Sequence, residues 1–152
     1  MRIAQAELNE FSFVKNITQK TINEIYPKYY PAGAVEFFLQ HHSDDNIIND
    51  IKQGKVYILQ NDFDEYIGTV TVDGNEIHRL FVLPEFQHNG FGRALMDHAE
   101  IVIAQNYSEV IIDASLPAKR IYRKRGYVET DYRTIIADNG DFLCYDVMRK
   151  EI

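Results

Sequence analysis

The segment EIHRLFVLPEFQHNGFGRALMDHAEIV, residues 76–102, decides the fold of this chain. Its first part becomes apolar on both faces towards the end, through Leu80, Phe81, Val82 and Leu83. Successive side chains of a strand point to opposite faces, so this pattern predicts a central strand over residues 76–83 that is covered on both sides. A helix is expected to follow, up to about residue 105, because Leu95, Ala99 and Val102 recur at the spacing of a buried helix face.

Between this strand and this helix lies QHNGFGR, residues 87–93, in which Gly90 and Gly92 are separated by one residue. The first amides of a helix have no partner within it, and the helix dipole favours an anion there. Without side chains at the two glycines an anion can approach those amides, which favours a pyrophosphate cradle. A tight strand-to-helix turn without a ligand explains the two glycines equally well. No lysine with serine or threonine follows Gly92, and no third glycine is present, so the sequence excludes a nucleoside triphosphate loop and a dinucleotide fingerprint.

The rest of the chain reads as a mixed α/β protein with a largely antiparallel sheet flanked by helices. Further strands are expected at 2–8, 55–60, 66–72, 109–115, 127–136 and 142–149, and further helices at 10–25, 34–42, 44–53 and 117–124. Asn9 and Ser43 are the expected caps of the helices over 10–25 and 44–53. Asn139-Gly140 is a strong hairpin turn signal between the last two strands. No repeat or linker divides the sequence, so one domain over residues 1–152 is expected.

The composition is typical of a globular protein, with 45% hydrophobic and 26% charged residues. The net charge of −7 argues against nucleic acid as a partner, because phosphate binding requires a basic surface. An acidic surface suits a cationic amine, and it also suits solubility alone. No apolar run reaches the length of a membrane span, and the N-terminus lacks the apolar core of a signal peptide, so no membrane partner is expected. The single cysteine excludes an internal disulfide, which makes the cytoplasm the expected compartment.

Two motifs in the second half of the chain resemble those of the GNAT superfamily of N-acetyltransferases. Gln87, Gly90 and Gly92 meet that family's Q-x-x-G-x-G/A signature for acetyl-coenzyme A (acetyl-CoA), at the start of a helix that follows an apolar strand. The segment SLPAKRIYRKRGY, residues 115–127, is similar to the family's N-x-x-A-x-x-x-Y-x-x-x-G-F/Y segment. The matching positions are Ala118, Tyr122, Gly126 and Tyr127. The segment departs from the pattern at Ser115, where asparagine is usual.

The resemblance implies the family's fold and a set of residues that bind acetyl-CoA. In this family the strand before the loop separates from its neighbour at a bulge, and its free backbone groups bind the pantetheine arm. Here the backbone of Leu80, Phe81 and Val82 would do so, and the Val82 amide would polarise the acetyl carbonyl. The expected cofactor-binding residues are Leu80, Phe81, Val82, Gln87, His88, Asn89, Gly90, Phe91, Gly92, Arg93, Ser115 and Tyr122. Whether Ser115 makes the contact of the usual asparagine stays open.

Two side chains are the expected proton carriers. Tyr122, at the tyrosine position of the family motif, would give a proton to the leaving coenzyme A thiolate as general acid. Without the motif, Tyr122 would be interpreted as a core tyrosine. Glu76 stands where some family members carry a catalytic glutamate, and it would take the proton of the attacking amine, directly or through water. His78 follows on the same strand face, and the alternative interpretation of Glu76 is a solvated residue at a hairpin end.

Three further groups of residues are weighed between a functional and a structural role. His41-His42 are interpreted as a helix end, and no metal site is expected. The basic run RKR, residues 123–125, is expected to face solvent or to reach the ribose phosphate of the cofactor. The aromatic segment YPKYY, residues 26–30, and the pair Phe37-Phe38 would either cover the acceptor site or form core.

The sequence therefore predicts a metal-independent N-acetyltransferase that transfers acetyl from acetyl-CoA to a primary amine of a small molecule by direct attack. A non-catalytic coenzyme A-binding module and an acetyltransferase for protein lysine or N-terminal amines are the alternatives. Tyr122, together with the complete signature around Gly90 and Gly92, favours an enzyme. The acceptor stays unnamed, because its pocket would be built from the N-terminal half and from strand ends, and a monomer or a homodimer is expected.

Overall fold

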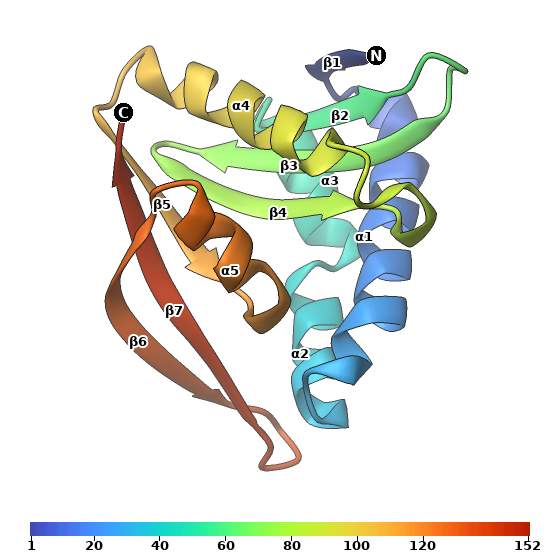
Figure 1. The fold of residues 1–152 in the computed structure, drawn as a ribbon. Coiled ribbons are helices and arrows are strands. Elements are labelled where there is room, and N and C mark those ends of the chain that lie inside the picture. Colours follow the sequence, from blue (N-terminus) through green and yellow to red (C-terminus); the bar gives the residue numbers. More distant parts are fainter.

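A seven-stranded sheet forms the centre of the molecule in the computed structural model, which describes residues 1–152 (Figure 1). The strands are β1 (Arg2–Gln5), β2 (Val56–Gln60), β3 (Tyr66–Asp73), β4 (Glu76–Val82), β5 (Glu109–Ala114), β6 (Val128–Ile136) and β7 (Phe142–Glu151). Their order across the sheet is β1-β2-β3-β4-β5-β7-β6. Neighbouring strands are antiparallel except β4 and β5, which run parallel. The mixed, largely antiparallel sheet predicted from the sequence is confirmed.

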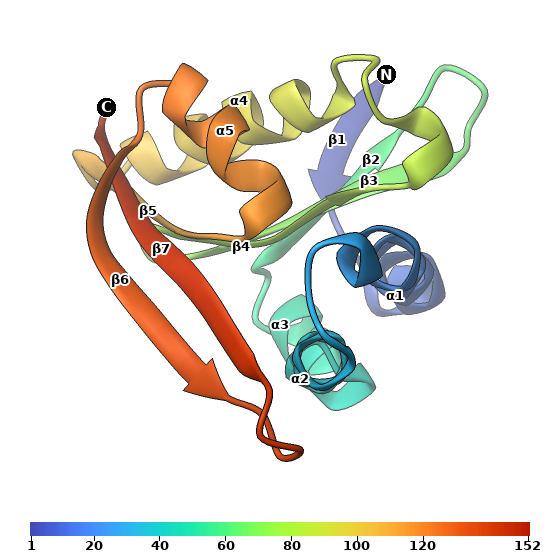
Figure 2. The same cartoon turned by 60° about the horizontal axis from the view of Figure 1, so that its bottom comes forward.

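Helices cover both faces of this sheet. They are α1 (Phe11–Ile25), α2 (Ala32–His41), α3 (Asp44–Lys52), α4 (Phe91–Ala104) and α5 (Leu116–Lys124). Short 3-10 turns are η1 (Leu8–Glu10), η2 (Tyr26–Lys28) and η3 (Pro84–Phe86). Figure 2 shows α4 and α5 above the sheet and α1, α2 and α3 below it. None of the helices is long and apolar enough to cross a membrane.

The strand β4 supplies side chains to both layers, as its sequence predicts. Val82 belongs to the core beneath α4, whereas Phe81 and Leu83 belong to the core formed with α1 and α2. All three side chains are buried. Alternate residues of one strand thus enter opposite cores, which identifies β4 as a central strand.

The helix α4 packs on the sheet through one apolar face. Leu95 and Ala99 are fully buried, as predicted. Val102 is only partly buried, because Ile103 takes the third position of the buried face. Burying a side chain of this size stabilises the fold by roughly 1.5–3 kcal/mol, so the position of the helix start, and of the loop before it, is fixed by the core.

The N-terminal elements differ from the sequence prediction. β1 ends at Gln5 instead of residue 8, because the chain turns into η1. There the carboxylate of Glu10 accepts a hydrogen bond from the amide of Glu7 at 2.8 Å. This capping box, and no side-chain bond from Asn9, begins the helical segment, so the cap predicted at Asn9 is wrong.

The next two helices follow the prediction more closely. α2 begins two residues earlier than expected, directly after Pro31, whose fixed φ suits a helix start. Ser43 caps α3 as predicted, since its hydroxyl accepts a hydrogen bond from the amide of Asn46 at 3.4 Å. Gly54 follows the end of α3 with a left-handed φ of +70°.

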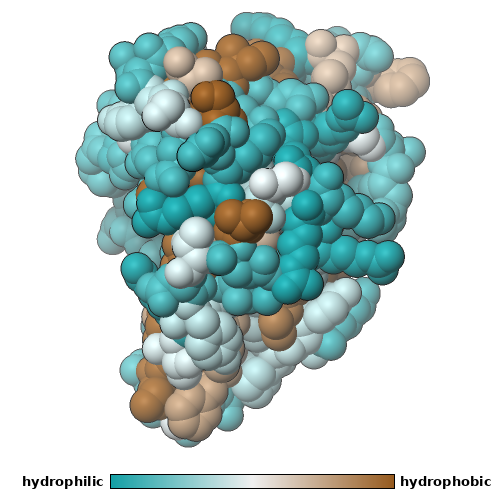
Figure 3. All heavy atoms as spheres, turned by 60° about the vertical axis from the view of Figure 1, so that its left-hand side comes forward, coloured by the Kyte–Doolittle hydropathy of each residue, from teal (hydrophilic) through white to brown (hydrophobic).

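The C-terminal hairpin of β6 and β7 forms one edge of the sheet. Its turn lies at Asn139-Gly140 as predicted, and the amide of Ala137 donates to the carbonyl of Asp141 at 2.8 Å. The carboxylate of Asp141 also accepts the amide of Gly33 in α2 at 2.8 Å, which ties the hairpin to the lower helical layer. Figure 3 shows a largely hydrophilic face with separate groups of apolar side chains, one of them at the lower end, where this hairpin turns.

Candidate active site

The sheet opens between its two parallel strands. β4 and β5 are paired only at Glu76 with Ile111 and at Ile77 with Ile112. The register between β4 and β3 then shifts, and Arg79, at the shift, has a left-handed φ of +45°. An extra residue in one strand bends it away from its partner. The separation of strands that the family resemblance implies is therefore present here.

Backbone groups of β4 face this gap. The amide of Leu83 donates to the carbonyl of Ile67 in β3 at 2.9 Å. Hydrogen-bonding direction alternates along a strand, so Phe81 also pairs with β3, while Leu80 and Val82 direct their backbone groups towards the gap. Of the three residues predicted to present backbone to the pantetheine arm, Leu80 and Val82 have the required direction. Phe81 lines the cavity with its side chain.

The glycine loop presents free amides beside the gap. Gly90 has φ +85° and caps α4 without a side-chain hydrogen bond. The first bond inside the helix runs from the amide of Ala94 to the carbonyl of Gly90 at 3.0 Å, so the amides of Phe91, Gly92 and Arg93 have no helical partner. A Cβ at Gly90 would meet no atom within 4 Å, and one at Gly92 would meet only a methyl of Val82 at 3.9 Å. The space above these amides is therefore open, which fits a diphosphate.

The side chains of Gln87 and Asn89 hold the conformation of the loop through hydrogen bonds to backbone carbonyls. The side-chain amide of Gln87 donates to the carbonyl of Val82 at 2.9 Å, joining the loop to the end of β4. The side-chain amide of Asn89 donates to the carbonyls of Phe86 and Gln87 at 3.2 and 3.0 Å. His88, the remaining predicted residue of the loop, is exposed and has φ +65°.

A cavity of about 830 Å³ passes through the gap and reaches both faces of the sheet. On the upper face it is lined by the glycine loop and by residues of α4 and α5, including Met96, Ala118 and Tyr122. On the lower face it is lined by α1, η2 and α2, including Phe37 and His41. Because one cavity serves both layers, two molecules that enter from opposite faces can meet between β4 and β5.

Tyr122 lies in this cavity and is almost fully buried. Its helix, α5, sits over the gap, and its ring lies 5.9 Å from the ring of Tyr127. Burial raises the pKa of Tyr122 above its ordinary value, and the nearby Tyr26 adds to this rise. The phenol is therefore protonated at neutral pH and can donate a hydrogen bond into the cavity.

Ser115 begins the same helix and also lines the cavity. Its hydroxyl contacts the hydroxyl of Tyr26, while the hydroxyl of Tyr30 accepts the amide of Leu116 at 2.7 Å. Burial raises the pKa of Tyr26 to about 12, so this phenol too is neutral. Tyrosines of the predicted aromatic segment thus fix the start of α5, a role that the sequence did not indicate.

The three basic residues at the end of α5, residues 123–125, make different contacts. Arg125 forms an ion pair with Glu100 at 2.8 Å and is only 17% exposed, which corrects the expectation that the whole run faces solvent. Arg123 is paired with Glu129. Lys124 lines the upper face of the cavity, on the side of the glycine loop.

Glu76 and His78 lie side by side, as their positions on one strand face predict. Nε2 of His78 is 3.2 Å from Oε2 of Glu76. His78 lines the cavity, whereas Glu76 stands behind it and is half exposed. A base at Glu76 would therefore act through His78 or through water.

Asp113 was missed by the sequence interpretation. It lines the cavity on β5, two residues before Ser115 and on the same strand face. Burial and the charge of Glu76 raise the pKa of its carboxyl, and Arg133, His78 and His41 oppose that rise. A lone acid within the apolar run VIIDA was the available signal, but it did not reveal which face of the sheet the acid would reach.

Arg79 at the bulge was also missed, and it anchors a buried polar cluster. Its guanidinium donates to Nδ1 of His42 at 3.3 Å, to the hydroxyl of Thr71 at 3.0 Å and to the carboxylate of Asp50 at 2.8 Å. The side chain of Arg79 is 4% exposed. Burial holds the pKa of His42 well below its ordinary value, and the charge of Arg79 acts in the same direction. His42 is therefore a neutral acceptor in the core, just after the end of α2.

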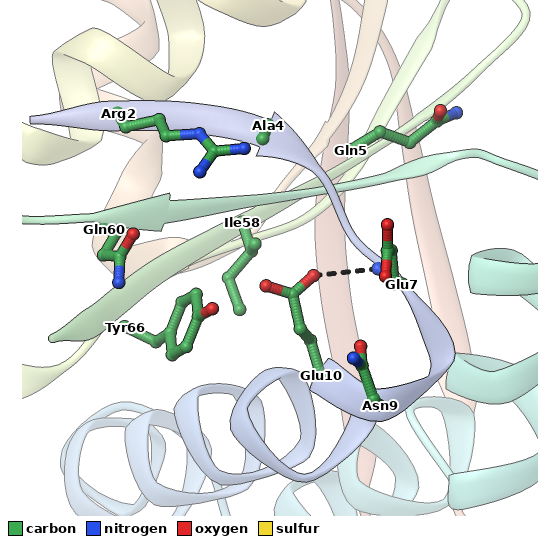
Figure 4. Close-up of a pocket in the computed structure, with 9 residues that line it drawn as sticks. All are labelled: Arg2, Ala4, Gln5, Glu7, Asn9, Glu10, Ile58, Gln60 and Tyr66. Atoms are coloured by element: carbon green, nitrogen blue, oxygen red, sulfur yellow. Dashed lines mark hydrogen bonds between the residues drawn. The ribbon is translucent and has the colours of Figure 1, made fainter. Parts of the chain in front are cut away.

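A second, smaller hollow of about 260 Å³ lies beside β1, β2 and the start of α1 (Figure 4). Its lining is mostly polar, and Glu10, at its centre in the picture, already binds the amide of Glu7. β1 is at one edge of the sheet, whereas the gap lies between β4 and β5. This hollow is therefore separate from the cavity that passes through the sheet.

The open glycine loop and the gap beside it have the geometry that an acyltransferase using a coenzyme A thioester requires. The family model described as the acetyltransferase (GNAT) domain matches residues 25–147. The chain belongs to the GNAT acetyltransferase family and is an acetyl-CoA-dependent N-acetyltransferase. No curated protein matches the sequence.

Solved structures share the fold at low sequence identity. A GCN5-related N-acetyltransferase from Rhodopseudomonas palustris is 21% identical, with a TM-score of 0.88 over 99% of this chain and 95% of that one. The PaiA N-acetyltransferase from Thermoplasma acidophilum, solved with coenzyme A, is 17% identical, with a TM-score of 0.75 over 99% and 98% of the two chains. YncA, a putative acetyltransferase from Salmonella typhimurium solved with acetyl-CoA, is 13% identical, with a TM-score of 0.75 over 99% and 93%.

Proposed function

We propose that this N-acetyltransferase acetylates a primary amine of a small molecule by direct attack on acetyl-CoA, without a covalent enzyme intermediate. The observation that carries the proposal is the single cavity that crosses the sheet between β4 and β5. The glycine loop and α5 lie on its upper side, and the aromatic layer of η2 and α2 lies on its lower side. Acetyl-CoA and the amine would thus occupy one continuous space from opposite faces.

Acetyl-CoA would be held mainly by backbone. The amides of Phe91, Gly92 and Arg93 would bind the pyrophosphate, where the helix dipole adds to the attraction. The backbone of Leu80 would pair with the pantetheine arm, as an added strand would, while the amide of Val82 faces the thioester. Gln87 would position this site by holding the carbonyl of Val82, 2.9 Å away.

Two groups of the chain would act on the reacting thioester. Acetyl-CoA supplies the carbonyl carbon that the amine attacks, so that a C–N bond forms while the C–S bond breaks. The amide of Val82 would donate a hydrogen bond to the carbonyl oxygen as negative charge develops there. Tyr122 would donate its phenolic proton to the departing sulfur, and its raised pKa means that this proton moves only as charge builds on the sulfur.

The amine must also lose a proton. An alkylamine with a pKa near ~10.4 is neutral about once in 2,500 molecules at pH 7, a handicap of roughly 4–5 kcal/mol. His78 would take the proton, because it lines the cavity, and Glu76 would orient the ring and stabilise its charge from 3.2 Å away. Glu76, the base predicted from the sequence, would thus act as the outer member of a pair with His78.

Release of free thiol from acetyl-CoA, measured with a panel of amines, tests the proposed reaction. Polyamines, amino acids, aminoglycosides, simple alkyl and aryl amines and lysine peptides should be compared at equal concentration. Turnover with at least one small amine is expected. Coenzyme A binding without thiol release would instead identify a non-catalytic module, and turnover with peptides alone would identify a protein acetyltransferase.

The proton acceptor is tested by the pH profile of Glu76→Gln and His78→Gln. Both variants should lower kcat most below pH 8, and the defect should shrink at higher pH, where water deprotonates more of the amine. A rise of KM alone would mean that these residues only bind the cationic substrate. Unaltered profiles in both variants would remove the pair from the mechanism.

A further inference from the structure

The lower part of the cavity has an apolar, aromatic wall. Tyr26, Phe37, Phe38, Ile135 and Leu143 line it. Their rings are held against one another, since Phe38 lies edge-on to Tyr26 at a centroid distance of 4.6 Å. Such a wall favours a flat or branched apolar group, which gains from burial and from ring contacts.

The acidic side chain in this part of the cavity is Asp113. It lies on β5, at the edge of the gap, facing His78, His41 and Arg133, with Glu76 behind His78. Burial lowers the pKa of His41, which keeps that ring neutral near pH 7. An ammonium group entering from below would therefore meet the carboxylate of Asp113 and the neutral ring of His41, close to the exposed backbone of β4.

The lysines and arginines that line the cavity leave no free cation in its lower part. Among the lysines and arginines that line the cavity, Arg93 in α4, Lys124 in α5 and Arg125, directly after α5, lie on the upper face. The fourth, Arg79, already donates to Asp50, Thr71 and His42 through all three of its nitrogens. Arg133 faces Asp113 from outside the lining, but it is paired with Asp131 at 3.4 Å. A carboxylate or phosphate on the acceptor would therefore meet the repulsion of Asp113 without a free cation to offset it.

We propose that the acceptor is a monoamine with an aromatic or branched apolar body and no acidic group, and that Asp113 binds its ammonium group before the proton is removed. This inference rests on the acetyl transfer proposed above and specifies its acceptor. Asp113 binds the charged amine, and His78 then accepts the proton at the gap. The body of the amine lies on Phe37, Phe38 and Tyr26.

A matched pair of substrates separates this proposal from its alternatives. Phenethylamine and phenylalanine share a ring and an amine, and they differ by one carboxylate. We expect kcat/KM for phenethylamine to exceed that for phenylalanine and for spermidine at least tenfold. A kcat/KM for phenylalanine, spermidine or a lysine peptide equal to or above that for phenethylamine would overturn the inference and leave acetyl transfer intact. Thiol release with none of these amines, from a protein that still binds coenzyme A, would count against the transfer itself.

The role of Asp113 is tested by Asp113→Asn, with Asp138→Asn as the control. Asp138 is exposed in the β6–β7 turn, so the control makes the same change of charge outside the cavity. Asp113→Asn should raise KM for phenethylamine at least tenfold and change kcat less than threefold. Coenzyme A-dependent thermal stabilisation should be unchanged, which checks that the variant is folded. An unchanged KM in a folded Asp113→Asn protein would overturn the assignment.

Discussion

The two faces of the cavity are built in different ways. The upper face, around the glycine loop, offers backbone amides whose directions follow from one strand end, two glycines and a helix start. The lower face offers side chains from α2, β4, β5 and β7, which are far apart in the sequence. Arg79 lies where the two meet, at the bulge that opens the sheet.

The two faces therefore depend on the sequence to different degrees. Backbone recognition depends on conformation, so many sequences can supply the same cradle, in keeping with the shared fold at 13–21% identity among the structural neighbours. Side-chain recognition depends on the identity of each residue, so the lower face can differ between family members.

Arg79→Met should have the largest effect, because it breaks the cluster that joins the two faces. Asp50 and Thr71 would lose their buried partner, and loss of one member of a buried ion pair typically costs about 3–5 kcal/mol. Urea unfolding measures this free energy. Arg133→Met, which removes an exposed arginine paired with Asp131, should cost less than about 1 kcal/mol. Equal losses in the two variants would show that the bulge does not depend on the cluster.

Gly90→Val should abolish coenzyme A binding. At about 100 times its dissociation constant, coenzyme A should stabilise the native protein by about 2.7 kcal/mol, a melting shift of roughly 5–10 °C. Gly140→Val is the matched control, since Gly140 has nearly the same φ, +87° against +85°, and equally open surroundings at the hairpin turn. Both variants should lose similar stability, but only Gly90→Val should lose the shift. A full shift in Gly90→Val, and in Gly92→Val, would rule out the loop as the cradle.

Tyr122→Phe should reduce kcat at least tenfold with little change in coenzyme A affinity, since a general acid typically contributes ~100–10,000-fold. Phenylalanine keeps the packing of the ring, so the loss would report the missing proton. Tyr127→Phe is the control, because that buried hydroxyl donates to Glu100 at 2.9 Å and lies outside the cavity lining. It should affect stability and leave kcat near that of the wild type. Wild-type turnover in Tyr122→Phe would show that Tyr122 is a core residue and does not act as general acid.

His42→Asn should flatten the pH dependence of stability on the acidic side. The folded protein keeps His42 neutral, whereas the unfolded chain binds a proton at this residue below about pH 6.5. The contribution of His42 to stability is therefore complete above that pH and decreases as the pH falls below it, by at most about 1.4 kcal/mol per pH unit. Asparagine keeps an acceptor for Arg79 without this titration. Urea unfolding at pH 7 and 5 measures the slope, and identical slopes would contradict the burial of a neutral His42.

Much of the fold followed from local patterns. The order of the strands and helices, the central character of β4, the cap at Ser43 and the Asn139-Gly140 turn are confirmed. The cap predicted at Asn9 is wrong because a neighbouring motif was overlooked. The capping box of Glu7 and Glu10 begins the helical segment in its place. The cofactor-binding and catalytic residues stay predictions, although the gap and the open loop have the geometry that they require.

The glycine loop could be located from the sequence alone, because a strand end, a helix start and two glycines are local features whose backbone conformation depends on near neighbours. The lower face of the cavity could not be derived from the sequence, because it depends on tertiary packing. Whether Asp113 faces the gap depends on the register of β5 against β4, and a shift of one residue would turn it to the other face. Whether Arg79 is buried depends on α2, α3 and β3 meeting at the bulge. These contacts depend on packing between segments far apart in the chain, so no pattern within one segment predicts them.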